Sequence, residues 1–467
     1  MSSVFLSAAH KSSGKTTFAI GLCAVLRQRG LAVQPFKKGP DYIDPAWLGL
    51  AAGRPCYNLD YFVAGEHETI GEFARRGANA DISLIEGNKG LHDGLDLDGR
   101  NSNAALAKAV RSPVILVLDV RGTIRGIAPL LIGYQIFDRE VDIAGVVANL
   151  CGGPRHESKL RAAVDAYTDI PFLGCLANDP ELTLDERHLG LVPGYEDVAA
   201  RRKIERIADA VRADIDVDRI LEIAQRAGPL DAPALPLRLP RRFDGLRIGI
   251  ARDRAFGFYY AGDLDAFAAA GAELVAIDTL NDTALPKLDG LLIGGGFPER
   301  HAAELAANQV MRAAVHDAIE AGLPTYAECG GLMYLSQSLT WNGETYPMTG
   351  VLPARTQMHD KPQGRGYVIL EAGETQHPWL PKGYAATGVN AHEFHYSSLH
   401  GLPADSRYAY HVRRGSGISE QRDGLIYKNL FASYCHLRNT GGTPWVESFL
   451  QFVARHKRPL HRAVGAD

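Results

Sequence analysis

Cys329 has the sequence context of a reactive nucleophile. It follows the apolar, strand-like run 322–326 and is followed by Gly330, Gly331 and a helical stretch that begins at Leu332. A nucleophile on a tight strand-to-helix turn needs small neighbours, because the backbone there is strained and lies close to the substrate. The helix N-terminus favours a thiolate and directs backbone N–H groups, here that of Gly330, at a developing oxyanion. Cys329 is therefore a candidate for covalent catalysis.

A glycine-rich loop and a distant histidine complement this cysteine. The apolar run 291–293 ends in three glycines, and the N–H of Gly296 is a natural second donor to the oxyanion. His436 follows another apolar run and is the candidate base, then acid. Together these features indicate an acyl-transfer site. Four other cysteines lack this context and are interpreted as inert packing: Cys23, Cys56, Cys151 and Cys175.

The N-terminal segment carries a different chemistry. The apolar strand Val4–Ala8 leads into a loop that ends in Gly-Lys-Thr, and an apolar helical pattern follows. Backbone N–H groups and the helix dipole of such a loop bind phosphates, while its threonine ligates magnesium. The predicted phosphate-binding residues are Ser12, Ser13, Gly14, Lys15, Thr16 and Thr17, with Thr16 also a magnesium ligand. The first glycine of the usual pattern is absent, so the alternative that Lys15 merely begins a helix on a solvated face stays open.

Asp119 is a second candidate magnesium ligand. It ends the continuous apolar run Val114–Asp119, which is typical of a buried strand. An acid at the end of such a strand contributes to the metal site beside a phosphate loop. The sequence therefore predicts a nucleotide site.

Composition limits the class of protein. The length of 467 residues suggests two or three cores. A net charge of −4 gives no electrostatic case for nucleic acid or an acidic membrane surface. Six cysteines without a close-spaced pair favour a reducing compartment. Because the sequence shows neither a charged-then-apolar leader nor an apolar run of membrane length, we expect a cytoplasmic protein.

Alternating strands and amphipathic helices indicate two α/β domains. The expected strands lie near 4–8, 32–37, 82–86, 114–119, 143–149 and 172–176 in the first half, and near 246–251, 273–277, 291–293 and 325–328 in the second. Prolines and glycines interrupt regular structure between these halves. We predict a doubly wound parallel-sheet domain with a P-loop at residues 1–226, a linker at 227–243, a second α/β domain at 244–455 and a basic tail at 456–467.

Several segments together carry a resemblance to one family. They are Pro35–Asp44, Glu86–Gly87, Leu91–Gly94, Glu186–Pro193, Ala251–Asp253, Phe258–Tyr260, Gly294–Glu299, Ala327–Tyr334 and His392–Ser397. In this order, over almost the whole chain, they resemble the cobyrinic acid a,c-diamide synthase family of glutamine-dependent tetrapyrrole amidotransferases. The motifs are highly specific for the family and much less so for its substrate.

The resemblance implies one reaction shared by two sites. The family's N-terminal domain, similar to dethiobiotin synthetase, uses ATP and Mg²⁺ to phosphorylate a tetrapyrrole acetate. Its C-terminal domain is a class I glutaminase that supplies ammonia. A free carboxylate is a poor electrophile, whereas ammonia displaces phosphate from an acyl phosphate. The implied partners are small molecules (the tetrapyrrole, ATP and L-glutamine), with no nucleic acid or membrane, and a homodimer is left open.

The resemblance also implies roles for individual residues. Glu86 matches the family's acid after the third strand and is expected to ligate magnesium or orient phosphate. The segments that line the tetrapyrrole and acyl-phosphate site in the family match Asp41, Tyr42, Asp44 and Asp93. An alternative is that Asp41 and Asp44 are helix caps, since an Asp before Pro45 is an ordinary turn signature.

The third member of the glutaminase triad is not evident from the sequence. Many class I glutaminases have an acid two residues after the histidine, but Arg438 stands there, which leaves Glu393 as a weak candidate. His392 and His395 resemble a zinc pair, yet no third ligand is evident.

Three departures from the corrinoid pattern keep other substrates open: His10–Ser13, Asn88–Lys89 and Gly257. They favour a sirohaem or nickel-sirohydrochlorin amide synthase, and cobyric acid synthase is a further alternative. Lys38, Asn88, Lys89 and His92 are candidates to bind a charged macrocycle, or else solvated surface groups. A different class also stays open: a P-loop partitioning or metal-delivery ATPase with an inactive glutaminase-like domain, given Lys11 ahead of the Gly-Lys-Thr.

Overall fold

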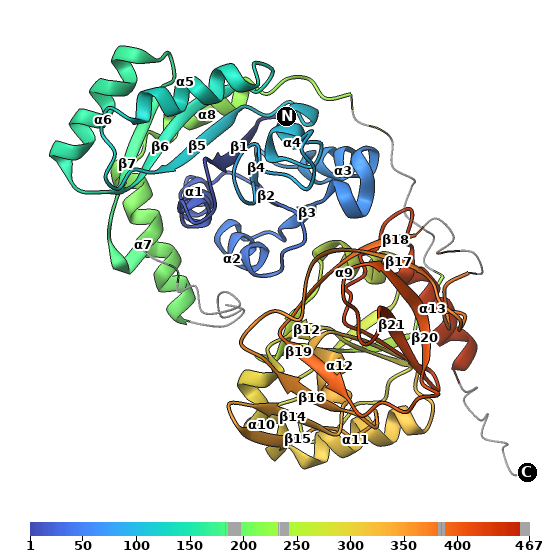
Figure 1. Ribbon diagram of the computed structural model, residues 1–467. Helices are drawn as coiled ribbons and strands as arrows, with labels where there is room; N and C mark the ends of the chain where they lie inside the picture. The colour runs from blue at the N-terminus through green and yellow to red at the C-terminus, as the bar shows by residue number, and fades with distance from the viewer. Residues whose placement is uncertain are drawn as a thin grey trace, which may run out of the picture. The chain divides into compact units, whose positions relative to one another are not determined.

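The computed structural model describes residues 1–182, 184, 198–231, 233, 242–381, 384 and 388–457. The chain divides into two compact units, Met1–Leu235 and Pro236–Asp467 (Figure 1). The expected motif Glu186–Pro193, much of the expected linker and most of the expected basic tail lie outside the described residues.

The first unit is built on a parallel sheet. Its described strands pair in the order β3-β2-β4-β1-β5-β6-β7, and every pairing is parallel. The strands are β1 (Ser3–Ala8), β2 (Val33–Lys38), β3 (Tyr57–Leu59), β4 (Ile82–Glu86), β5 (Val114–Asp119), β6 (Ile143–Cys151) and β7 (Phe172–Ala177). The helices are α1 (Lys15–Gln28), α2 (Ile43–Ala52), α3 (Tyr61–Gly77), α4 (Asn103–Ala109), α5 (Ile127–Phe137), α6 (Pro154–Tyr167), the 3₁₀ helix η1 (Pro180–Leu182), α7 (Val198–Asp214) and α8 (Val217–Gln225).

Both faces of this sheet are buried, which explains its continuous apolar strands. Val4 and Leu6 of β1 belong to a hydrophobic cluster with residues of α1, α2, α7 and α8. Phe5, between them, is fully buried as well, and strand geometry directs it to the opposite face. Figure 1 shows α5 and α6 on the other side of the sheet from α1 and α2. The predicted doubly wound parallel sheet is confirmed, with β3 as a strand that the sequence had not indicated.

The strand order positions the candidate nucleotide site. The chain passes from β1 to β2 on one side and later to β5 on the other, so the topology switches beside β1. Ligands of such sheets bind in the crevice at the carboxyl ends of the strands on either side of the switch. Lys37, Glu86 and Asp119 lie at the carboxyl ends of β2, β4 and β5, and the phosphate loop follows β1.

The second unit contains a mixed sheet. Its described strands pair in the order β10-β8-β11-β13-β22-β21-β20-β17-β18, parallel from β10 to β22 and antiparallel beyond. The strands of this sheet are β8 (Arg247–Ala251), β10 (Glu273–Ile277), β11 (Gly290–Ile293), β13 (Thr325–Glu328), β17 (Gly364–Ala372), β18 (Val389–His395), β20 (Arg407–Arg414), β21 (Arg422–Tyr427) and β22 (Leu430–Ser433). The predicted second α/β domain is confirmed in fold class, whereas its antiparallel half was not predicted.

Smaller elements complete the second unit. A pair is formed by β9 (Phe256–Phe258) and β12 (Gly295–Gly296), and a separate sheet by β14 (Ser338–Trp341), β15 (Glu344–Pro347), β16 (Arg355–Met358) and β19 (Ser397–His400). The helices are α9 (Ala261–Ala270), the 3₁₀ helix η2 (Pro298–His301), α10 (Ala302–Ala307), α11 (Gln309–Glu320), α12 (Gly330–Leu335) and α13 (Trp445–His456).

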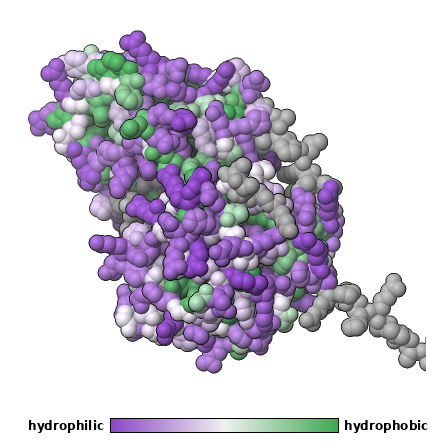
Figure 2. Space-filling view, turned by 45° about the vertical axis from the view of Figure 1, so that its right-hand side comes forward, coloured by the Kyte–Doolittle hydropathy of each residue, from purple (hydrophilic) through white to green (hydrophobic). Residues whose placement is uncertain are grey.

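One face of the molecule is mainly polar. The face in Figure 2 is largely hydrophilic, with apolar patches scattered over it. Among the helices that the structure describes, none has the length and apolar character needed to cross a membrane.

Candidate active sites

The phosphate loop is shaped by a glycine that packs against an asparagine. Ser12, Ser13 and Gly14 form the end of the loop, and Lys15, Thr16 and Thr17 form the first turn of α1. Gly14 has a φ of +86°, and a Cβ there would lie 1.9 Å from Asn149 Nδ2. The same amide nitrogen donates a hydrogen bond of 3.0 Å to the Ser13 carbonyl. Only glycine fits this position, and the loop is held against the N-terminus of α1, where phosphates bind.

Lys15 and Thr16 extend from the start of α1 into this site. Lys15 is 7 % exposed, and its Nζ donates to the His10 carbonyl at 3.4 Å. Burial lowers the pKa of Lys15 to about 8. The negative charge of Glu86 acts in the opposite direction, but burial outweighs it. Thr16 Oγ1 donates to Glu86 Oε1 at 2.5 Å and to Asp44 Oδ2 at 3.3 Å. The threonine hydroxyl thus meets two carboxylates.

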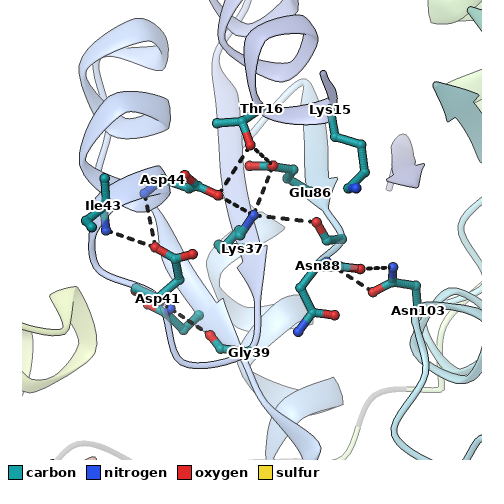
Figure 3. A network of polar contacts seen from close by, with 12 residues as sticks. Lys15, Thr16, Lys37, Gly39, Asp41, Ile43, Asp44, Glu86, Asn88 and Asn103 are labelled. Atoms are coloured by element: carbon teal, nitrogen blue, oxygen red, sulfur yellow. Dashed lines mark hydrogen bonds and ion pairs between the residues drawn. The ribbon is translucent and has the colours of Figure 1, made fainter. Parts of the chain in front are cut away.

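Lys37 joins these two carboxylates (Figure 3). Its Nζ lies 2.6 Å from Asp44 Oδ2 and 2.9 Å from Glu86 Oε1. Burial alone would lower the pKa of Lys37, but the charges of Asp44 and Glu86 outweigh it and raise the pKa. Burial raises the pKa of Glu86 to about 7 in spite of Lys37. One lysine, two acids and a threonine therefore form a compact buried cluster beside the phosphate loop.

Asp41, another predicted substrate residue, caps a helix. Its Oδ1 accepts hydrogen bonds from the backbone N–H of Ile43 at 2.9 Å and of Asp44 at 3.1 Å (Figure 3). These are the bonds that the helix-cap alternative expected. Burial raises the pKa of Asp41 to about 6. Tyr42 follows directly, before α2.

The other predicted acids have separate partners. Asp93 Oδ2 accepts from the Gly90 N–H at 3.0 Å. Asp119 is held by the Arg121 guanidinium, with Oδ2 2.6 Å from Nη2. In the part of the chain that the structure describes, no hydrogen bond or ion pair joins Asp119 to Thr16 or Glu86.

The loop after β4 is fastened next to the phosphate loop. Asn103 Nδ2 donates to the Gly90 carbonyl at 3.0 Å, and a Cβ on Gly90 would lie 2.5 Å from the carbonyl oxygen of Ala9. Lys38, 4 % exposed, donates to the Asn101 carbonyl at 2.8 Å and to Asn88 Oδ1 at 3.4 Å. Burial lowers the pKa of Lys38 to about 8. These hydrogen bonds hold the backbone of the loop after β4 in place beside the predicted tetrapyrrole-binding residues.

Oxygen ligands for a divalent cation are present in the cluster. Among the described residues, no group of three or more His, Cys, Asp or Glu side chains has a metal-binding arrangement. However, Glu86 Oε2 is buried with no hydrogen-bond partner among those residues, which is the kind of orphan acceptor that a cation satisfies. The Thr16 hydroxyl and the Asp44 and Glu86 carboxylates are the hard oxygen donors that Mg²⁺ prefers. The residues therefore fit magnesium.

In the second unit, Cys329 sits on a strained turn between β13 and α12. Its φ of +45° and ψ of −98° are rare for a residue with a side chain. Its backbone N–H donates to the Ser433 carbonyl at 2.7 Å, which ties the turn to the end of the neighbouring strand β22. Strained backbone at such a turn is common for nucleophiles.

His436 lies beside Cys329 because β13 and β22 are parallel neighbours. Burial would lower the pKa of His436, but hydrogen bonds with Cys329 and Glu328, together with their charges, raise it to about 10. The Nδ1 atom of His436 is 3.4 Å from Glu328 Oε2. The predicted cysteine and histidine are therefore brought together, with the Glu328 carboxylate next to the imidazole ring.

The glycine loop packs against both residues. A Cβ on Gly330 would lie 3.0 Å from the Gly296 nitrogen, so the two predicted oxyanion donors are neighbours. A Cβ on Gly295 would lie 2.7 Å from His436 Cε1. The Tyr259 hydroxyl accepts from the Gly294 N–H at 2.8 Å and fixes the start of the loop. Side chains larger than hydrogen would separate these parts.

His392 and His395 have different neighbours. The ring of His392 stacks on His436, with centroids 4.8 Å apart, and its Nδ1 lies 3.2 Å from the Tyr260 hydroxyl. The ring of His395 stacks on Tyr434 at 3.9 Å, and its Nδ1 contacts the Ser397 carbonyl at 2.8 Å. Residues three apart on a strand point to opposite faces, so the two rings do not form a pair of ligands.

Two contributors were missed by reasoning from the sequence. Lys37 lies within the segment Pro35–Asp44, for which the resemblance implied roles for acids and a tyrosine only; a lysine near the end of a buried strand was the signal. Glu328 directly precedes Cys329, whereas many class I glutaminases have this acid after the histidine. A buried acid on the strand of the nucleophile would have been the signal.

Comparisons with known proteins extend this picture. A family model described as CobQ/CobB/MinD/ParA nucleotide binding domain matches residues 7–192, and one described as CobB/CobQ-like glutamine amidotransferase domain matches residues 247–442. The fold and the two sites thus define a nucleotide-binding unit joined to a glutamine amidotransferase unit in one amidating ligase.

Curated relatives match over nearly their full length. A cobyrinate a,c-diamide synthase of Magnetococcus marinus is 44 % identical over 454 residues, which cover 96 % of this chain and 96 % of that protein. One of Methanosarcina acetivorans is 40 % identical, covering 93 % and 92 %, and one of Archaeoglobus fulgidus is 39 % identical, covering 91 % and 91 %. The chain belongs to the cobyrinate a,c-diamide synthase family. This result sets aside the partitioning or metal-delivery ATPase.

Proposed function

We propose that the protein converts the a and c acetates of cobyrinic acid to amides, using ATP and glutamine. The observation that carries the proposal is the hydrogen-bonded Cys329–His436 pair in a chain that also holds a buried lysine–carboxylate cluster at its phosphate loop. The names of the relatives support the choice of a tetrapyrrole, cobyrinic acid, as the substrate. Residues 1–226 are assigned the synthase role, 244–455 the glutaminase role, 227–243 the linker and 456–467 a basic tail.

The first half-reaction activates a carboxylate. The substrate acetate attacks the γ-phosphorus of ATP, which gives an acyl phosphate and ADP. Lys15 and the N–H groups of the phosphate loop bind the phosphates, and the Lys37 ammonium offsets charge on the transferring group. Thr16, Asp44 and Glu86 would hold Mg²⁺, which neutralises phosphate charge when bound. Ammonia then attacks the acyl carbon and phosphate leaves.

The second half-reaction releases ammonia from glutamine. The Cys329 thiolate attacks the amide carbon, and the oxyanion is bound by the N–H groups of Gly296 and Gly330. The His436 imidazolium gives its proton to the leaving nitrogen. His436 then takes a proton from water, which hydrolyses the thioester to glutamate and restores the thiolate.

Mass spectrometry of the products tests the substrate. The protein is given ATP, Mg²⁺ and glutamine together with cobyrinic acid, sirohydrochlorin or sirohaem. We expect one or two hydroxyl-to-amine replacements on cobyrinic acid. Preferred amidation of sirohydrochlorin or sirohaem would favour the sirohaem-type substrates that the loop departures indicate. If no tetrapyrrole is amidated while glutamine is hydrolysed, the tetrapyrrole assignment is wrong.

A further inference from the structure

Glu328 occupies a position from which it faces the proposed acid/base group. It is the last residue of β13, 6 % exposed, and directly precedes Cys329. Its register partner on β22 is Ser433, three residues before His436. The carboxylate thereby reaches the imidazole from the strand of the nucleophile, with Oε2 3.4 Å from Nδ1.

The other oxygen of this carboxylate is anchored. Oε1 accepts a hydrogen bond from the Leu437 N–H at 3.0 Å and another from the Tyr326 hydroxyl. Tyr326 is fully buried and stands two residues earlier on β13, on the same face. With Oε1 fixed by two donors, Oε2 has a defined direction toward the imidazole. The Leu437 bond also fixes the backbone just after His436.

Three other buried acids of this unit accept hydrogen bonds from groups other than His436. Glu393 accepts from the N–H groups of Ser416 at 2.7 Å and Gly417 at 3.0 Å. Asp263 binds the N–H of Asn439 at 3.0 Å and the indole of Trp445 at 3.1 Å. Asp423 binds backbone N–H groups, including that of Cys435 at 3.1 Å. Each of the three carboxylates therefore accepts hydrogen bonds that stabilise a loop.

Arg438 stands two residues after His436, where many class I glutaminases have an acid. Arg438 lies with its guanidinium carbon 5.6 Å from the centre of the Tyr260 ring, whose hydroxyl contacts His392. A cation there supplies no acceptor for an imidazole N–H. Among the residues that the structure describes, Glu328 and Cys329 from β13 and its turn and His392 from β18 face His436, and Arg438 acts on His392.

We propose that Glu328 is the positioning carboxylate of the glutaminase site and replaces the acid that Arg438 displaces. The inference rests on the proposed glutaminase function. A carboxylate at Nδ1 keeps the proton on that nitrogen, so that Nε2 is left for the thiol, and stabilises the imidazolium. It thereby favours the thiolate–imidazolium pair that attacks glutamine. Glu328 acts through His436 and does not touch glutamine.

Glu328→Gln tests the role with little change in shape. The amide NH₂ facing Nδ1 makes that nitrogen an acceptor and moves the ring proton to Nε2, the wrong tautomer for a base. In the Ser-His-Asp triad the matching change costs about 10⁴-fold in kcat. For a cysteine nucleophile, which is intrinsically reactive, we expect a loss of about 10- to 10³-fold in kcat for glutamine hydrolysis, with KM little changed.

The pH dependence separates positioning from general destabilisation. Loss of the anion lowers the pKa of His436, so the alkaline limb of kcat/KM moves to lower pH. Alkylation of Cys329 by iodoacetamide at neutral pH becomes slower for the same reason, with Cys329→Ala as the background. The matched control is Glu393→Gln, a buried acid of the same unit, which leaves both profiles unchanged for the folded enzyme.

The outcomes are distinct. Wild-type kcat and pH profiles in Glu328→Gln would overturn the proposal. So would equal losses in Glu328→Gln and Glu393→Gln that follow the folded fraction. If Cys329→Ala itself hydrolyses glutamine at the wild-type rate, the assignment of glutamine hydrolysis to Cys329 and His436 fails, whatever Glu328→Gln does.

Discussion

Lys37 and Glu86 are directly opposite each other on the parallel strands β2 and β4, and their side chains form a buried ion pair of 2.9 Å. A buried pair offsets its desolvation only when further hydrogen bonds satisfy both ions. Lys37 donates one to Asp44, and Thr16 donates one to Glu86. The pair therefore holds a cation and an acid in fixed positions at the carboxyl edge of the sheet, next to the phosphate loop.

Lys37→Met should stop amidation with either glutamine or ammonium as nitrogen source, because both routes need the acyl phosphate in the proposed mechanism. Glutamine hydrolysis should continue at a basal rate. Removal of one partner from a buried pair also costs about 3–5 kcal/mol, so the first unit should unfold at a lower urea concentration. The measurements are product mass spectrometry and urea unfolding.

Lys108→Met is the matched control for Lys37→Met. Lys108 also pairs with two acids, Asp138 and Glu140, but near the surface. Such pairs contribute about 0–1 kcal/mol. We expect wild-type amidation and nearly unchanged unfolding. Ammonium-supported amidation by Lys37→Met would contradict its assignment to phosphoryl transfer.

Gly14→Ala should abolish nucleotide binding. The new Cβ would overlap Asn149 Nδ2 and would require a left-handed backbone conformation that alanine rarely adopts. The loop would shift away from the N-terminus of α1, where its N–H groups meet phosphate. Calorimetric titration with ATP measures the effect. Gly133→Ala on α5, where nothing lies within 4 Å of the added Cβ, is the control.

Continuous apolar runs made the central strands predictable. The expected strands 82–86 and 114–119 coincide with β4 and β5, since each strand is buried on both faces and consists mainly of apolar residues. The strands β17 and β20 mix exposed and buried positions in an irregular order, so their sequences carry no comparable signal. The phosphate loop and the cysteine turn were visible because each depends on residues close together in the chain.

Contacts between strands that are distant in the chain could not be predicted in the same way. Glu328 contacts His436 because β13 and β22 are neighbours in the sheet, and a single sequence does not show which strands pair. Likewise, Lys37 meets Glu86 through the pairing of β2 with β4. Asp119 stays a predicted magnesium ligand, and its carboxylate accepts a hydrogen bond from Arg121, two residues later.

Cys329→Ala should separate the two nitrogen sources. Without the thiol no thioester forms, so glutamine-supported amidation is lost. Saturating ammonium should still support amidation, since Lys15 and Lys37 are unaffected. Coupled measurement of ADP and amide product checks this. Loss of the ammonium reaction as well would contradict the division of labour between the units.

His436→Ala should reduce glutamine hydrolysis far more than His395→Ala. A general base contributes about 10²- to 10⁴-fold, and His436 alone of the two is hydrogen-bonded to the thiol. His395 stacks on Tyr434 and serves packing. Turnover per folded molecule is the quantity to compare. A larger loss in His395→Ala would move the acid/base role to the segment His392–Ser397.

The charge on His436 should make the second unit less stable at alkaline pH. Hydrogen bonds and charges of Cys329 and Glu328 raise the pKa of His436 to about 10, from about 6.5 in the unfolded chain. A raised pKa means that the folded state binds the proton more tightly. The stabilisation is therefore fully present below about pH 6.5 and is lost as pH rises through about 10.

Urea unfolding of the whole protein between pH 6.5 and 10 measures this dependence. The free energy of unfolding assigned to the second unit should fall over that range, and His436→Asn should flatten the slope because asparagine carries no proton that titrates there. His400→Asn, at an exposed histidine at the end of β19, should keep the wild-type slope. If His436→Asn also keeps it, the imidazolium is not held by Glu328 and Cys329, and the triad geometry loses its electrostatic support.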